Sequence, residues 1–138
     1  MFPNQAFLDA WTPRALAVLR IVTAYLFVQH ATAKLFGVPH QAAFDNLQLL
    51  SLVGIAGLIE IVFTPLVLIG LFTRLAAFIL SGEMAFAYFI GHASRGHVAT
   101  PMLNGGELAV LYCFVFLFLA VAGGGAWSVD AARGSPRA

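Results

Sequence analysis

Long runs of apolar residues alternate with short polar breaks along the chain. A membrane-spanning helix needs about 20 predominantly apolar residues. Runs of this kind cover residues 14–36, 49–71, 74–93 and 103–122. The longest connection between them is "GVPHQAAFDNLQ". The pattern predicts an all-α fold: a four-helix transmembrane bundle that forms a single membrane domain over residues 1–138.

Proline and glycine positions refine these boundaries. Pro13 suits the first position of the first helix, since proline lacks only an N–H that would have no partner there. Gly37 and Pro39 end that helix, whereas Pro65 lies inside the second and is expected to kink it. The turn "GLFTR" is very short, so the second and third helices are expected to be antiparallel neighbours.

Composition narrows the class of protein. Hydrophobic residues make up 61% of the 138 residues and charged residues 9%, whereas about a quarter of a soluble domain is charged. The net charge of +1 gives no basic footprint for nucleic acid. The single cysteine, Cys113, excludes an internal disulfide or a CxxC motif. With no phosphate loop or nucleophile elbow either, a self-sufficient enzyme of the soluble type is disfavoured.

Charges flanking the predicted spans indicate the orientation. An even number of spans puts both termini on one side, together with Arg14, Arg74, Arg133 and Arg137, and with Arg20 nearby. Lys34 and Arg95 lie on the other side. The positive-inside rule then places both termini in the cytoplasm, and we expect a multi-pass protein of the cell (inner or plasma) membrane. Trp11 and Trp127 fall just outside the first and last spans, where aromatic belts lie.

The first span also has features of a signal peptide, with Arg14 before it and "ATA" as a mimic of a cleavage site. However, Arg20 interrupts its apolar run and Lys34 follows at once. We therefore expect this segment to remain as a membrane helix.

Ionisable residues inside the spans form two layers. Arg20, His30 and Lys34 share one face of the first helix at 100° per residue. Glu60 and Glu83 lie at similar distances on either side of the short turn, which places both near mid-membrane. The predicted inner layer is Arg20, Glu60 and Glu83, and the predicted outer layer is His30, Lys34, Asn104 and Glu107.

Two interpretations fit the inner layer. Glu60 and Glu83 are a candidate catalytic pair that carries protons, with Arg20 tuning them, since two close carboxylates cannot both ionise easily. Alternatively, the three charges form a structural network that sets the helix register.

The outer layer also has two interpretations. His30, Lys34, Asn104 and Glu107 are candidate cofactor-binding residues, because a histidine that donates to a carbonyl and exchanges a proton suits quinone chemistry. The alternative is a satisfied His30 and a Lys34 that extends to the membrane surface. We predict no metal site, since no HxxxH or HxH spacing occurs.

The segments "GEMAFAY" and "GELAVLY" share the pattern G-E-[ML]-A-x-x-Y. The pattern is consistent with an internal repeat, and equally with coincidence in a restricted alphabet of residues.

The chain resembles the DoxX family of small four-helix membrane proteins. The resemblance rests on "RIVTAYLFVQHATAKLFG", "GLIEIVFTPLVLIGLFTRLAA", "GEMAFAYFIGHASRG", "LNGGELAVLYCF" and "AGGGAWSVD", which cover nearly the whole chain in order. Some members look like subunits of a thiosulfate:quinone oxidoreductase, and others are associated with membrane redox or oxidative-stress complexes. The resemblance carries over to Arg20, Lys34, Glu60, Arg74, Glu83, Asn104, Gly105, Gly106 and Glu107.

The resemblance implies a DoxX-like membrane subunit of a quinone-linked redox system, at most an oxidoreductase subunit without its own redox centre. A quinone is the candidate cofactor, and electrons would come from a partner. The expected partners are the lipid bilayer, other membrane or redox subunits and a second copy of the chain, but not nucleic acid. Two alternatives remain: a non-catalytic assembly subunit, and a small carrier or lipid-binding protein.

Overall fold

The computed structural model describes residues 4–134, and this part of the chain contains helices and no strand. The helical elements are α1 (Gln5–Phe36), η1 (Ala42–Phe44), α2 (Leu52–Ile69), α3 (Thr73–Phe86), η2 (Ala87–His92), η3 (Ala93–Arg95), α4 (Pro101–Asn104), α5 (Glu107–Ala122) and α6 (Val129–Ala132). The predicted all-α class is confirmed. Arg137, used above to predict the orientation, lies outside the described residues.

Within residues 4–134, three helical stretches are long and apolar enough to cross a membrane: Gln5–Phe36, Leu52–Ile69 and Thr73–Arg95. The fourth apolar helix, Glu107–Ala122, is shorter. Large apolar side chains cover the outside of all these helices, as Phe78 (63% exposed), Phe114 (63%) and Val121 (70%) illustrate. Such extensive apolar exposure indicates a surface that contacts lipid.

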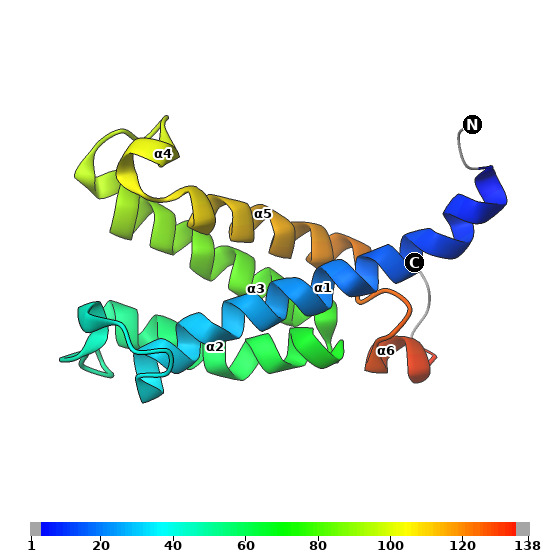
Figure 1. Ribbon diagram of the computed structural model, residues 1–138, viewed down its shortest axis with the longest axis horizontal. Coiled ribbons are helices and arrows are strands. Elements are labelled where there is room, and N and C mark those ends of the chain that lie inside the picture. Colours follow the sequence, from blue (N-terminus) through cyan, green and yellow to red (C-terminus); the bar gives the residue numbers. More distant parts are fainter. Residues whose placement is uncertain (1–3, 135–138) are drawn as a thin grey trace.

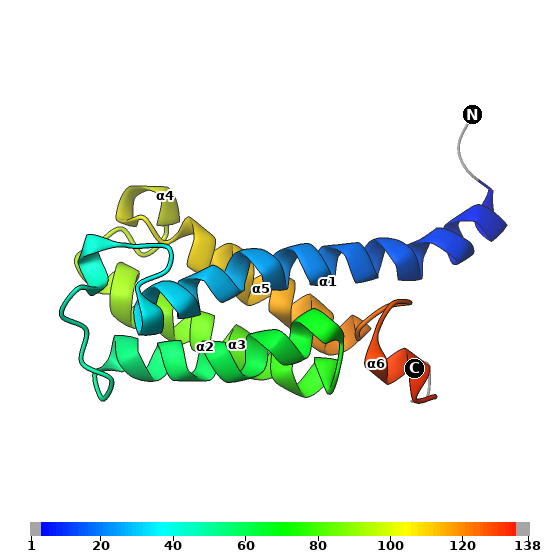
Figure 2. The ribbon, with the colours of Figure 1, turned by 60° about the horizontal axis from the view of Figure 1, so that its bottom comes forward.

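The long helices lie side by side (Figures 1 and 2). Helix α1 packs along α2, α2 packs against α3 after a tight turn, and α3 packs along α5. The first turns of α1 project beyond the other helices, and α6 lies near that end (Figure 1). The ends of α1 and α2 that meet at the η1 connection therefore lie at the opposite end from the first turns of α1 and from α6.

Helix α1 begins ahead of the expected span 14–36. Asn4 caps it, because the Asn4 side chain accepts a hydrogen bond from the Phe7 N–H at 2.9 Å. Pro13 consequently lies inside the helix and not at its first position. At the other end, Gly37 has a φ of 67° and ends α1 where expected.

The expected helix 103–122 is divided into α4 and α5. Gly105 ends α4 with a φ of 72°, a left-handed conformation that glycine adopts readily. The Asn104 side chain then accepts a hydrogen bond from the Gly106 N–H at 2.9 Å. Glu107 is therefore in the first turn of α5, and Asn104 belongs to a separate short helix.

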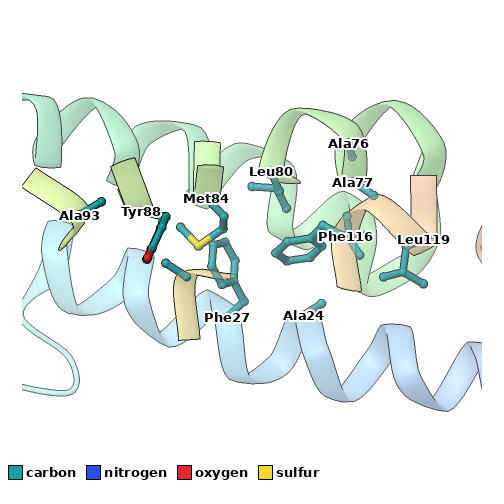
Figure 3. Close-up of a cluster of buried hydrophobic side chains, with 12 residues drawn as sticks. Ala24, Phe27, Ala76, Ala77, Leu80, Met84, Tyr88, Ala93, Phe116 and Leu119 are labelled. Atoms are coloured by element: carbon teal, nitrogen blue, oxygen red, sulfur yellow. The ribbon is translucent and has the colours of Figure 1, made fainter. Parts of the chain in front are cut away.

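The interior of the helix assembly combines aromatic rings with small residues (Figure 3). Phe27 of α1 packs edge-on against Phe116 of α5, with ring centroids 4.9 Å apart. Leu80 of α3 is fully buried. Small side chains such as Ala24 and Ala77 allow close approach of the backbones around these rings.

The C-terminal segment is fixed to the turn between α2 and α3. Both carboxylate oxygens of Asp130 accept hydrogen bonds: Oδ1 from the Phe72 N–H at 2.9 Å, and Oδ2 from the Thr73 N–H at 2.9 Å and hydroxyl at 2.8 Å. Burial alone would raise the pKa of Asp130, but these hydrogen bonds, together with the nearby charge of Arg133, lower it below its ordinary value. Asp130 thereby caps the start of α3 from a distant part of the chain.

Candidate functional site

A buried ion pair joins α1 to α2. The Lys34 Nζ lies 2.6 Å from Oε1 of Glu60, and their side chains are 11% and 0% exposed. Gly57, one turn before Glu60, allows the approach, because a Cβ there would lie 3.2 Å from the Cβ of Lys34. The pair therefore neutralises a carboxylate that would otherwise be isolated in an apolar interior.

Glu83 completes what we call the central cluster, namely Lys34, Glu60 and Glu83. It lies on α3, which packs against α2, and it interacts electrostatically with both Glu60 and Lys34. Its Oε2 atom is buried and has no hydrogen-bond partner among the described residues; the same holds for Oε2 of Glu60 and the hydroxyl of Thr64. Since buried polar atoms are normally hydrogen-bonded, these oxygens are available to a proton, a water molecule or a ligand.

Arg20 is not brought to the carboxylates. Its guanidinium donates to backbone carbonyls of Val67, Leu68, Gly124 and Trp127, at 2.8 Å for Val67, 2.8 Å for Gly124 and 2.6 Å for Trp127. The physical reason is the direction of helical side chains, which tilt toward the helix N-terminus. On α1 this tilt carries Arg20 away from Glu60 and Glu83, to the end of α2 and the C-terminal segment. Arg20 is fully buried there.

The same tilt carries Lys34 inward from its position near the end of α1. The sequence analysis placed Lys34 in the outer layer, but its ammonium group reaches Glu60 of the predicted inner layer. Lys34 therefore takes the place that was expected for Arg20 beside the two carboxylates.

His30 lies one turn before Lys34 and is half-buried. Its ring packs against Phe27, with centroids 5.7 Å apart, and against Tyr112 of α5, with centroids 6.0 Å apart. It also interacts electrostatically with Lys34. His30 is thus the expected outer-layer residue that stays next to the central cluster.

Within residues 4–134, Asn104 and Glu107 form no hydrogen bond or ion pair with Lys34. The Asn104 amide donates to the carbonyls of Gly96 and His97 at 3.4 and 3.3 Å, so it organises the connection after η3. Glu107 is exposed at the start of α5. The break at Gly105 is the reason, since it removes the continuous helix that would have placed both residues on one face. The four-residue outer layer is therefore not assembled as expected.

Sequence reasoning missed two contributors near the cluster and one elsewhere. Tyr112, next to His30, was noted only as part of a repeated pattern, and Thr64, whose hydroxyl is unbonded, was not predicted as a site residue. His40, which was not predicted as a site residue, contacts Asp45 within the connecting loop at 2.8 Å. The helical spacing of Glu60 and Thr64 was the signal in the sequence that could have identified Thr64.

A hollow of about 300 Å³ lies at the end of α1, beside the η1 connection. Lys34, Gln41 and Asp45 are among the residues that line it. One side of Lys34 therefore faces a polar surface hollow, while its ammonium group is bonded to the buried Glu60. Lys34 therefore lies between the hollow and Glu60.

Apolar helices around a buried charge cluster define a small helical membrane protein. The DoxX family profile matches residues 15–93, more than half of the chain. An uncharacterized protein of Haemophilus influenzae is 47% identical over 129 residues, which cover 89% of this chain and 93% of that protein. The chain belongs to the DoxX family. No solved structure matches it.

Proposed function

We propose that the protein is a DoxX-type subunit of a quinone-linked redox system in the cell membrane. In this proposal α1, α2, α3 and α5 form a four-helix transmembrane bundle that makes up a single domain with both termini in the cytoplasm. The charge distribution supports the orientation, since Arg14 near the start of α1, Arg74 at the start of α3 and Arg133 after α6 lie at the same end of the protein. Lys34 and Arg95 lie at the other end.

The central cluster carries the functional proposal. Buried ionisable residues in membrane helices are costly and commonly mark proton pathways. Lys34 offers one positive charge to two carboxyl groups, so Glu83 has no counter-charge of its own. A proton that arrives through the hollow beside Lys34 would be exchanged with Glu60 and then with the unbonded oxygen of Glu83.

His30 and Tyr112 are the residues that would hold a quinone head. Their rings lie beside each other and adjoin the central cluster through Lys34, so an aromatic surface and a group that exchanges protons occur together. A bound quinone would accept two electrons and two protons. A partner protein must supply the electrons. The chain's own contribution would be to orient the ligand at His30 and to deliver protons from Glu83 and Glu60.

Quinone retention by the purified protein tests this proposal. We expect the full chain to retain added ubiquinone and the His30→Ala variant to lose it, because the ring that orients the head is removed. Glu107→Gln is the matched control, since Glu107 is exposed and forms no ion pair with Lys34 among the described residues. Retention by His30→Ala at the level of the unchanged protein would overturn the assignment of His30.

Arg20 favours a second candidate function, a non-catalytic assembly subunit whose buried charges serve only packing. All of the Arg20 contacts given above are to backbone carbonyls, which is a structural use of a buried charge. Under this alternative, Glu83→Gln would alter assembly with partner subunits and leave quinone retention unchanged. Under the redox proposal, the same variant would assemble normally and lose redox-linked proton exchange.

A further inference from the structure

A second cleft lies at the opposite end of the protein from the hollow beside Lys34. Its volume is about 890 Å³, and it is bounded by the projecting part of α1, the start of α3 and the C-terminal segment before α6. Figures 1 and 2 show these elements converging at that end. Arg14, Thr73, Arg74, Gly123, Trp127 and Ser128 are among the residues that line it.

The two arginines of the cleft are not paired with acids. The Arg14 guanidinium stacks over the Trp11 ring at 5.5 Å and donates to the Ala10 carbonyl of its own helix. Arg74 donates to the Val121 carbonyl. Neither takes part in a salt bridge within residues 4–134. A guanidinium carries five N–H donors, so both retain donors for a ligand.

The acidic residues of the cleft are already hydrogen-bonded. Asp9 accepts a hydrogen bond from the Gln5 amide at 2.8 Å. Both oxygens of Asp130 are used by the start of α3. The free charged donors that the cleft offers to a ligand are therefore those of Arg14 and Arg74.

Gly123 leaves the guanidinium of Arg74 uncovered. A Cβ at Gly123 would lie 3.6 Å from the Nε and Nη2 atoms of Arg74, so any larger residue would place atoms against the guanidinium. Trp127 lines the cleft and is 59% exposed. Trp11 is not part of the lining, but it stacks on Arg14 and is 52% exposed. Tryptophan is enriched at the depth of the lipid headgroups.

We propose that this cleft binds the phosphate group of an anionic phospholipid headgroup. Arginine forms forked hydrogen bonds with phosphate, and basic pockets at the cytoplasmic ends of membrane helices suit anionic headgroups. The lipid would join the projecting part of α1 to the C-terminal segment through Arg14 and Arg74. This inference rests on the membrane orientation proposed above, but it is independent of quinone binding.

Tryptophan fluorescence of the full chain in detergent tests the proposal. In a Trp11→Phe background, Trp127 is the single reporter, and phenylalanine keeps an aromatic face for Arg14. Short-chain phosphatidylglycerol, short-chain phosphatidylcholine and inorganic phosphate are titrated separately. We expect a saturable change with phosphatidylglycerol, a weaker response to phosphatidylcholine, and little response to phosphate because it lacks the glycerol and acyl parts.

Arg14→Gln and Arg74→Gln should each weaken phosphatidylglycerol binding about fivefold, as expected for loss of one cation near a lipid surface. Arg95→Gln, at the other end of the protein, should leave binding unchanged. Arg14 bonds only within its own helix, so its variant keeps the test valid even if Arg74→Gln fails to fold. Unchanged affinity in Arg14→Gln would overturn the proposal, as would equal binding of phosphatidylcholine. An equal response to inorganic phosphate would show that the cleft binds a free anion, and it would overturn the proposal of a lipid ligand.

Discussion

Lys34 and Glu60 form an ion pair of 2.6 Å across the contact between α1 and α2, and the Glu60 side chain is completely buried. The two residues approach because α1 and α2 are antiparallel and each side chain tilts toward the start of its own helix. Lys34 therefore points away from the η1 end, while Glu60 points toward it. The pair brings a positive charge next to Glu83 as well, so one lysine organises two carboxyl groups.

Removing one partner of this pair should lower the stability of the fold more than removing both partners does. Lys34→Met and Glu60→Gln are each expected to lower the free energy of unfolding by about 3–5 kcal/mol, because each leaves a buried group uncompensated. The double variant should recover a large part of the loss. Thermal unfolding in detergent, followed by circular dichroism, measures this, with the exposed Arg95→Met as control. Additive losses in the double variant would contradict the pairing.

Arg20 should not be replaceable by lysine. Arg20→Lys keeps the positive charge but loses the planar fork that reaches carbonyls of α2 and of the C-terminal segment. We expect it to destabilise the fold by about 3 kcal/mol, close to the effect of Arg20→Met. The same unfolding measurement checks this. Full stability of Arg20→Lys would show that charge alone matters at this position.

Asp130 should make stability depend on pH. Its folded-state pKa is lowered from the ordinary value of 3.8, so its contribution is fully present above that value and is lost as the pH falls through the lowered pKa. Asp130→Asn should remove this dependence and cost about 1 kcal/mol as the loss of a helix cap. Unfolding midpoints between about pH 5 and pH 2 provide the measurement. An unchanged pH profile in Asp130→Asn would contradict the role assigned to this carboxylate.

The repeated pattern offers a matched pair of glycine substitutions. A Cβ at Gly106 would lie 2.7 Å from the Tyr88 ring, whereas one at Gly82 would meet nothing within 4 Å. We expect Gly106→Ala to destabilise the protein by about 1–3 kcal/mol through overpacking. Gly82→Ala should instead be neutral or stabilising by up to about 1 kcal/mol, since it lies inside a helix. Equal unfolding midpoints would show that the two copies of the pattern are equivalent.

Much of the fold could be predicted from the apolar pattern. The helical class and the three long helices follow from runs of apolar residues, and the end of α1 at Gly37 follows from glycine. The start of α1 could not be predicted from the apolar pattern, because the cap at Asn4 precedes a stretch with mixed polarity. The break at Gly105 was also missed, since hydropathy does not register a left-handed residue within an apolar run.

The pairing of charges could be predicted only in part. Helical periodicity placed Arg20 and Lys34 on one face, and depth alone then suggested Arg20 as the partner of Glu60. The direction of the side chains reverses that choice, and this direction could have been read from the helix orientation. The repeat of Glu83 at Glu107 is misleading in the same way: Glu83 has a buried oxygen, whereas Glu107 is exposed.

Redox-linked infrared difference spectroscopy on the purified protein with bound ubiquinone tests the central claim most directly. The proposal predicts a carboxyl C=O band that changes between the oxidised and reduced states, that disappears in Glu83→Gln and that persists in Glu107→Gln. In the proposal, the unbonded oxygen of Glu83 is the site of that proton exchange. A spectrum of Glu83→Gln identical to that of the unchanged protein would contradict the assignment of proton transfer to the central cluster.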